Sequence, residues 1–342
     1  MILHYKCSGC GSDMGFDTES GNLSCQSCGR HDTIENYPED LVTTRFSVDE
    51  ASEYHCENCG AVLITTVETA ATSCSYCGAA VVIADRLSGQ LAPAKVIPFT
   101  ISKEEAMAAF QKWCRKGLLT PKDFMTADRI KSITGMYVPF WLFDLNSKVQ
   151  VSAECTKVRT YTQGDYIYTE TKYYDAFRDI NLDYLKIPVD ASVKMNDELM
   201  DKLEPYPYDQ LKDFRTPYLA GYIAEKYNFT DEELFPRAKD KISGYVESYI
   251  SSTFSGYHST HYKSKHIDTR NVESKYVLLP VWMISYNYKN TDYTFAMNGQ
   301  TGKVVGKPPI SNGKIAAWFS GIAVGTFFSL KCVSFMMGGG FW

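Results

Sequence analysis

The sequence predicts an α+β chain with four parts: two small cysteine-rich modules, a mixed β-rich α+β domain and a C-terminal apolar helix. Three observations lead to this prediction. Eight of the 11 cysteines lie in four C-x-x-C pairs before residue 80. Helical and β-prone stretches alternate between residues 91 and 310. Residues 311–342 contain a long apolar run.

Composition and charge limit the classes of partner. The net charge of −5 predicts no general attraction to nucleic acid or to anionic lipid. Residues 1–90 hold four Lys/Arg and 13 Asp/Glu, whereas residues 91–342 hold 31 Lys/Arg and 27 Asp/Glu. Tight cysteine pairs within an odd total indicate metal binding in a reducing compartment. The chain begins without a signal-peptide pattern, so we expect a cytosolic N-terminus.

The two cysteine-rich modules repeat one pattern, C-x2-C-x14-C-x2-C, with a period of 49 residues. The eight candidate metal ligands are Cys7, Cys10, Cys25, Cys28, Cys56, Cys59, Cys74 and Cys77. A glycine follows the second cysteine of every pair: Gly11, Gly29, Gly60 and Gly78. Such a turn favours a residue with positive φ, and tetrahedral zinc about 2.3 Å from each sulfur fits the spacing. We therefore predict one zinc ribbon over residues 1–45 and another over 46–90. The alternative metal is iron of the rubredoxin type, in which case the protein would be an iron redox carrier.

Zinc ribbons of this kind are similar to those of transcription factors and replication helicases, so a nucleic-acid-associated role is the alternative function. Binding to DNA needs Lys and Arg to replace counterions. Residues 1–90 contain only four Lys or Arg residues, which are Lys6, Arg30, Arg45 and Arg86. The acidic surface disfavours nucleic acid and favours a protein partner with a basic face.

The predicted α+β domain covers residues 91–310. An extended, proline-bearing linker is expected over residues 91–99. Ser102 and Glu105 form a capping-box pattern at the start of a helix that Gly117 ends. Cys114 lies on the apolar face of that helix, where we expect it to be buried.

A second helix is predicted to follow the capping box of Thr230 and Glu233 and to continue to Phe254. Because Pro236 lies near its beginning, we expect a late start or a kink. After this helix His258, His261 and His266, with Asp268 nearby, fall in a Ser-, Lys- and Tyr-rich segment. We interpret that segment as a solvated loop and not as a metal site.

The β-rich stretches are expected at 137–143, 148–155, 159–171 with a turn at 163–165, 277–286, and 293–305 with a turn at 298–302. The pattern Pro-x-Trp occurs at Pro139–Trp141 and again at Pro280–Trp282, which suggests a duplicated strand pair. The known catalytic signatures that we searched for are absent from the sequence, so we do not expect an enzyme.

The C-terminal segment, residues 311–342, is predicted to be a single-pass transmembrane helix. Ile315–Leu330 is an uncharged run of 16 residues, and a snorkelling Lys331 makes the stretch long enough to span a bilayer. More lysines precede the run than follow it, so the positive-inside rule leaves the N-terminal domains in the cytosol. Ala317, Gly321 and Gly325 form a small-residue stripe suited to helix contacts in the membrane.

Double C-x-x-C-G ribbons, a Pro-x-Trp β domain and a C-terminal apolar helix together resemble a bacterial family typified by YdjG. Its members are often labelled as transcription-factor-type zinc ribbons or as primosomal helicase-like. The resemblance implies that the eight cysteines bind metal, and it implies flotillin-like or phage-shock-type membrane scaffold partners and an envelope stress response. The expected function is a membrane-anchored zinc-ribbon adapter at the cytosolic face of the cell membrane.

Overall fold

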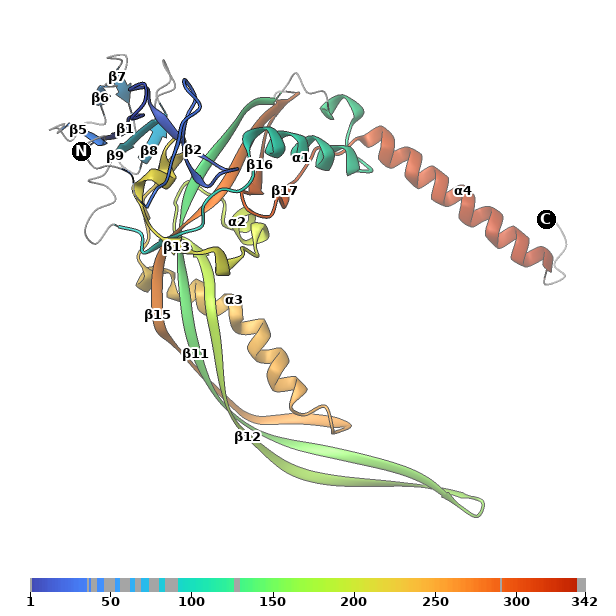
Figure 1. The fold of residues 1–342 in the computed structure, drawn as a ribbon. Helices are drawn as coiled ribbons and strands as arrows, with labels where there is room; N and C mark the ends of the chain where they lie inside the picture. Colours follow the sequence, from blue (N-terminus) through green and yellow to red (C-terminus); the bar gives the residue numbers. More distant parts are fainter. Residues whose placement is uncertain are drawn as a thin grey trace.

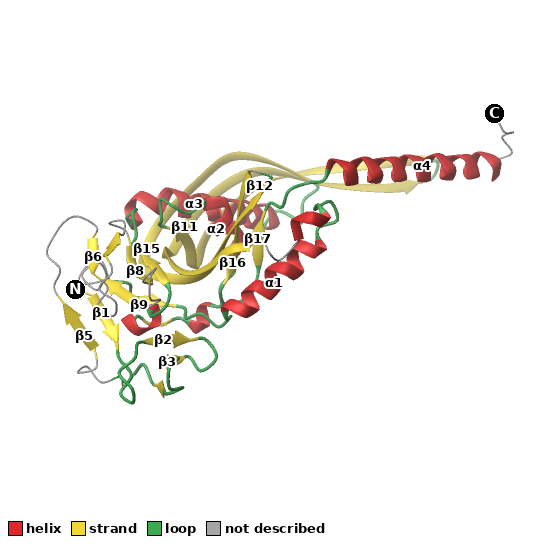
Figure 2. Ribbon diagram, turned by 90° about the horizontal axis from the view of Figure 1, so that it is seen from above, coloured by secondary structure: helices red, strands yellow, loops and turns green. Residues whose placement is uncertain are grey.

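The computed structural model describes residues 2–35, 37, 42–45, 53–55, 62–64, 69–73, 80–83, 92–125, 130–289 and 291–336. These residues form a mixed α+β fold with three parts, a head, a curved β-sheet arm and a separate C-terminal helix (Figure 1). The arm and the helix leave the head at different points (Figure 1). Seen from above, α4 extends away from the head as one straight helix (Figure 2).

The first 90 residues contribute short strands. They are β1 (Ile2–Tyr5), β2 (Met14–Asp17), β3 (Asn22–Cys25), β4 (His31–Asp32), β5 (Val42–Arg45), β6 (Glu53–His55), β7 (Val62–Ile64), β8 (Thr69–Ser73) and β9 (Ala80–Ile83). β2, β3 and β4 form a small antiparallel sheet, and β6 pairs with β7. β1, β5, β8 and β9 join the large sheet of the head. The N-terminal region is therefore connected to the head by strand pairing.

The rest of the chain alternates long strands with helices. The elements are β10 (Lys95–Val96), α1 (Lys103–Lys116), β11 (Ile130–Gln163), β12 (Tyr166–Asp190), α2 (Asp197–Leu203), β13 (Lys212–Asp213), β14 (Ile223–Glu225), α3 (Asp231–Ser252), β15 (Ser259–Tyr288), β16 (Thr291–Asn298), β17 (Val304–Gly306) and α4 (Asn312–Met336). Short 3-10 helices cover Lys122–Met125, Tyr208–Gln210 and Thr216–Leu219.

The large sheet runs in the order β13-β10-β15-β11-β14-β8-β9-β1-β5, with β12 added to β11, β16 added to β15, and β17 added to β16. In the head, β14 lies parallel to β11, and antiparallel to β8. Further along β11 its neighbour becomes β12, while β15 stays on the other side as far as the pair Thr156 and Ser259. The arm is therefore three-stranded at its root, and only β11 and β12 continue to its end.

Both predicted capping boxes are present. Ser102 and Glu105 cap α1, which ends at Gly117, and Thr230 and Glu233 cap α3. Because α3 begins directly after Thr230 and passes through Pro236, the expected late start does not occur. Burial of Cys114 among apolar residues agrees with the prediction and raises its pKa to about 12.

The stretch expected as an extended linker contains β10, which pairs with β13 and β15, while Ile97 and Phe99 are buried, so its described residues 92–99 pack on the head. The expectation for the chain after α3 was wrong. The histidine-rich segment is not a loop, because residues 259–268 belong to β15. The side chains of His258, His261 and His266 are nevertheless exposed, as expected.

Three apolar clusters form the core. One joins the first cysteine module to α1 and the base of the large sheet, and a second lies between α2 and the strands of the head. The third fills the space between α3 and the arm, where α3 places the stripe Leu234, Ala238, Ile242, Val246 and Ile250. The spacing of four residues puts this stripe on one helical face, so α3 supports the root of the arm.

Candidate metal centre

The loop between β1 and β2 forms the first half of the centre. The Cys7 amide donates to the Ser12 carbonyl at 2.8 Å, and the Gly11 amide donates to the Cys7 carbonyl at 2.8 Å. Gly11 has a φ of +74°, a conformation that is costly for a residue with a Cβ. The Gly9 amide points at the Cys7 sulfur, with the nitrogen 3.4 Å from Sγ. This tight turn brings the Cys7 and Cys10 side chains to one side of the loop.

The second half repeats this turn after β3. The Cys25 amide donates to the Arg30 carbonyl at 2.8 Å, and the Gly29 amide donates to the Cys25 carbonyl at 2.9 Å. Gly29 has a φ of +73°. The expected need for glycine after each pair is therefore confirmed at both turns of this module. The corresponding Gly60 and Gly78 lie outside the described residues.

The two turns bring four sulfurs together. All four Sγ atoms of Cys7, Cys10, Cys25 and Cys28 lie within 4.8 Å of one another. Cys7 and Cys28 are 3.5 Å apart, as are Cys10 and Cys25. A tetrahedral ion about 2.3 Å from each sulfur requires sulfur–sulfur distances of about 3.8 Å. The four free thiols thus fit a tetrahedral metal ion, and a disulfide would need sulfurs only about 2 Å apart.

The thiols do not ionise equally. The Gly9 amide lowers the pKa of Cys7, and Ser12 lowers the pKa of Cys10 to about 6. The Arg30 amide acts in the same direction on Cys28, but the neighbouring thiols outweigh it and raise the pKa of Cys28 to about 12. A thiolate at Cys28 is therefore unfavourable unless a cation lies among the sulfurs. A bound divalent cation supplies that charge, so metal binding and release of the Cys28 proton are coupled.

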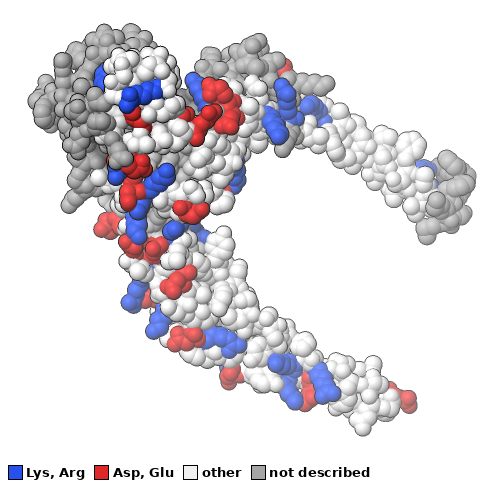
Figure 3. Space-filling model, viewed as in Figure 1, with Lys and Arg blue, Asp and Glu red and all other residues white. Residues whose placement is uncertain are grey.

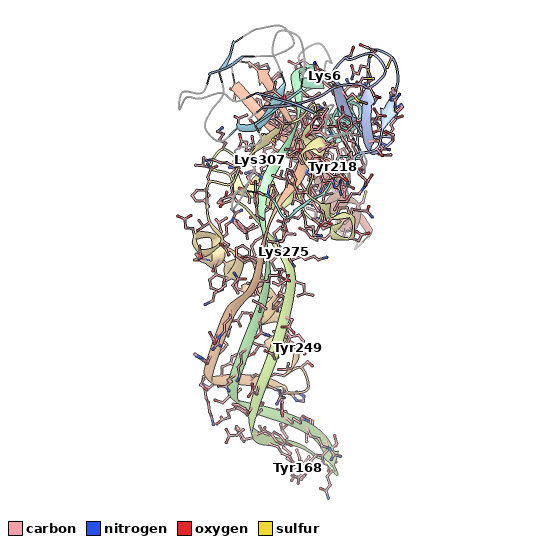
Figure 4. The ribbon with its side chains drawn as sticks, turned by 60° about the vertical axis from the view of Figure 1, so that its left-hand side comes forward. Lys6, Tyr168, Tyr218, Tyr249, Lys275 and Lys307 are labelled. Atoms are coloured by element: carbon pink, nitrogen blue, oxygen red, sulfur yellow. The ribbon has the colours of Figure 1, made fainter. Side chains whose placement is uncertain are left out.

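The cationic side chains beside the centre are already paired. Lys6 lies 2.7 Å from Asp13, and Arg30 lies 3.0 Å from Asp32. The ion pair with Asp32 also raises the pKa of Arg30. Figure 4 places Lys6 at the end of the molecule opposite the arm's tip.

Aromatic contacts hold the module on the head. The Phe16 ring lies 5.6 Å from that of Tyr218, and the Phe16 amide donates to the Ala220 carbonyl at 2.9 Å. The Tyr5 hydroxyl donates to Thr216 at 2.5 Å. The sequence analysis missed these docking residues, because nothing in the cysteine pattern relates β1 and β2 to residues 216–220.

The remaining predicted ligands are Cys56, Cys59, Cys74 and Cys77, which lie outside the described residues. Strands β7 and β9 lie in that module. Within the described ranges, the first-module cysteines are the only group of three or more His, Cys, Asp or Glu side chains placed to share a metal ion. The second metal site stays a prediction.

The C-terminal helix α4 is the second candidate functional feature. One stretch of it, Asn312–Val333, is long and apolar enough to cross a membrane, and none of its most apolar window is buried. On the face that Figure 3 shows, α4 is uncharged between its two ends. Among the described residues, the hydrogen bonds that fasten the helix to the head lie near its beginning, where the Ser311 amide donates to the Leu119 carbonyl at 2.8 Å and the Lys314 ammonium donates to the Thr120 carbonyl at 2.6 Å.

Comparison with known proteins identifies a relative over the full length. The chain is 72% identical over 341 residues to the Bacillus subtilis (strain 168) protein YdjG, which is described as uncharacterized, and the match covers 100% of both chains. Family models and solved structures gave no match. Identity at this level over the entire length shows common descent and a common fold, and the chain therefore belongs to the YdjG family.

Proposed function

We propose that the protein is a membrane-anchored adapter, in which zinc-bound modules and the head form protein-binding surfaces and α4 fixes them to the cytosolic face of the cell membrane. The observation that carries this proposal is α4, an apolar helix of 25 residues that leaves the head with its apolar side chains exposed. A helix that is apolar on all sides is stable in an apolar surrounding such as lipid or a protein interior.

The metal centre supports a structural role for zinc. The cysteines of the first module supply all four ligands of a tetrahedral ion, so no coordination position is left for substrate or water. Structural zinc sites of this kind contribute directly to folding. By the sequence repeat, we assign a second zinc to Cys56, Cys59, Cys74 and Cys77.

A protein partner fits the first module better than nucleic acid does. Lys6 and Arg30 already form ion pairs with Asp13 and Asp32, which lowers the net positive charge that they could offer to phosphates. The four thiolates add further negative charge beside them. Flotillin-like and phage-shock-type scaffold proteins are the partners that the family resemblance implies.

The orientation follows from the lysines that flank α4. Lys303, Lys307 and Lys314 precede the apolar run, whereas Lys331 lies near its end. Positively charged flanks stay on the cytosolic side, so we infer that the head and the arm face the cytosol.

The adapter role is tested by crosslinking in cells and identifying the captured proteins by mass spectrometry. The full chain is compared with a chain that ends at Ile310 and so lacks α4. We expect membrane scaffold proteins to be captured by the full chain only. Capture of nucleic acid or replication proteins in equal amounts by both chains would contradict the adapter role and support a nucleic-acid function.

The metal is tested on the purified full chain by elemental analysis and absorption spectroscopy. We expect two zinc ions per chain, and about one in a Cys7→Ser/Cys28→Ser variant. A visible absorption band with stoichiometric iron would identify a rubredoxin-type centre instead.

A further inference from the structure

The far end of the arm carries an unpaired strand edge. β15 pairs with β11 only as far as Ser259, so residues 157–172, which we call the tip, contain β11 and β12 alone. Within the described part of the chain, β12 forms a strand pair only with β11, so its other edge has no strand partner; near the head Lys241 of α3 donates to the Pro188 carbonyl of β12. Figure 4 shows Tyr168 at the far end of the arm, well beyond Tyr249 of α3. An open edge of this length is a template for another strand.

Large apolar side chains gather on this open strand. The exposed fractions are 71% for Tyr166, 73% for Ile167, 45% for Tyr168, 70% for Tyr173, 39% for Tyr174 and 61% for Phe177. All six belong to β12, while the β11 side of the tip contributes only Tyr161 to the exposed large apolar residues. Aromatic and β-branched residues stabilise strands by cross-strand contacts, so the composition of β12 favours pairing.

The backbone groups that point outward can be assigned from the turn. Gln163 and Tyr166 are partners across the two-residue loop, and residues that flank such a loop direct their amide and carbonyl groups at each other. Along a strand, the backbone groups of successive residues point alternately to one edge and to the other. β12 pairs with β11 without a register shift until residue 184. Ile167, Thr169, Thr171, Tyr173 and Asp175 therefore direct their backbone groups to the open edge.

We propose that this edge binds the same edge of a second copy of the chain, as an antiparallel β12–β12 pair with Thr171 on the two-fold axis. This register places Glu170 of each copy opposite Lys172 of the other, and Tyr168 opposite Tyr174. It aligns the outward-pointing residues of the two strands, so that Thr169 faces Tyr173 and Thr171 faces itself. The tips then form a four-stranded sheet with the two heads at opposite ends.

The charges select this register over its neighbours. Centring the pair on residue 170 would place two Glu170 side chains opposite each other, and centring it on residue 172 would do the same with Lys172. Within one chain Lys172 already lies opposite Lys157, and its acidic neighbour is Glu170 at 3.4 Å. A second carboxylate from the other copy balances this pair of cations. Opposite charges stabilise and like charges destabilise directly opposed cross-strand positions.

The register is tested by site-specific crosslinking of the full chain in detergent. Two cysteine variants, Thr171→Cys and Thr169→Cys, are compared. Both also carry Cys332→Ser, which removes the exposed thiol of α4. Thr171→Cys places two thiols on the axis, with Cα atoms about 5.5 Å apart. Thr169→Cys, the matched control, places its thiols about 14 Å apart, since four residues of strand separate them. With a short bismaleimide we expect Thr171→Cys to give covalent dimer and Thr169→Cys at least about tenfold less. Equal yields from both variants, or no dimer from Thr171→Cys, would overturn the proposal.

Charge reversal distinguishes pairing between chains from effects within one chain. We expect Glu170→Lys or Lys172→Glu alone to weaken dimerisation about tenfold, because both attractive pairs become repulsive. Mixing the two single variants restores opposite charges across the interface only when the strands belong to different chains, so we expect dimer to return in the mixture. A mixture that stays monomeric would contradict the proposal. If the chain stays monomeric and its tip tyrosines become shielded from solvent only when phosphatidylglycerol vesicles are added, the tip would instead bind a lipid surface.

This pairing does not depend on the adapter role. A chain that dimerises through the tip but captures no membrane scaffold proteins would retain the inference and lose the proposed function.

Discussion

The helices α3 and α4 have similar lengths, 22 and 25 residues, but they treat their apolar residues in opposite ways. α3 buries one stripe of residues against the arm and exposes polar groups elsewhere. α4 exposes apolar residues on every side, including Phe319, which is 75% exposed, and Phe328, which is 62% exposed. A helix with one apolar stripe is suited to fold in water against a partner, whereas a helix that is apolar on every side is suited to an apolar solvent such as lipid.

The largest expected effect comes from adding charges to α4, and it is a change in localisation. Ile322→Arg/Val324→Arg places two charges near the middle of α4, where each costs about 2.5–3.5 kcal/mol in a spanning helix. We expect the variant to move from the membrane fraction to the soluble fraction or to be degraded. Ile322→Leu/Val324→Leu keeps the apolar character and is the matched control. Fractionation after a carbonate wash measures the result, and an arginine variant that stays in the membrane fraction would contradict a spanning role for α4.

The same truncation in the two helices is expected to affect stability differently. Ile242 is 1% exposed, so Ile242→Ala should reduce the free energy of unfolding by about 2–5 kcal/mol. Ile322 is 59% exposed outside the membrane, and Ile322→Ala should leave the unfolding of the head unchanged within about 0.5 kcal/mol. Urea unfolding of the full chain in detergent, followed by tryptophan fluorescence, compares the two. Equal losses would mean that α4 packs on the head in solution.

A substitution at the beginning of α3 is expected to cause a smaller loss of stability. Thr230 accepts a hydrogen bond from the Glu233 amide at 3.3 Å, and the Glu233 carboxylate accepts one from the Thr230 amide at 2.8 Å. Thr230→Ala removes the first bond and should cost about 1 kcal/mol, whereas Thr230→Ser should cost much less. Thermal unfolding measured by circular dichroism would show the difference. A threonine cap that is no better than alanine would indicate that packing alone fixes the start of α3.

A test of similar size concerns pH. Asp190, at the end of β12, is 1% exposed, and burial raises its pKa to about 7 although the Ser192 amide and Arg237 act in the opposite direction. A carboxyl whose pKa is higher in the folded state binds its proton more tightly there, so folding is disfavoured as the pH rises from about 4 to about 7. Raising the pH from 6 to 8 should therefore cost about 1 kcal/mol through Asp190. Asp190→Asn should be less sensitive to that change, and identical pH profiles would show that the carboxyl titrates normally.

Local patterns in the sequence predicted the local parts of the fold. Capping boxes depend on residues three apart, and the turn at 163–165 depends on adjacent residues, so both were found where expected. The four-cysteine cluster of the first module is also local, because Cys7 and Cys28 are joined by a short chain segment. The apolar run of α4 needed only composition.

Long-range pairing accounts for what the sequence did not predict. The stretches expected at 137–143 and 148–155 belong to a single strand of 34 residues, because β15 pairs with β11 along most of it. The segment around His261 looked like a loop because its side chains are polar, yet its backbone pairs with Glu154, more than a hundred residues earlier. The docking of Phe16 on Tyr218 likewise joins distant segments. No pattern of a few residues contains such information.

The short attachment between head and helix has a mechanical consequence. Ser311 and Lys314 fasten the first turn of α4 to the carbonyl groups of Leu119 and Thr120, so the helix and the head turn together. A spanning helix changes its tilt when the thickness of the bilayer changes. In a membrane, the head would therefore tilt together with α4. Because the arm is long, a small change in tilt would move its tip by a large distance.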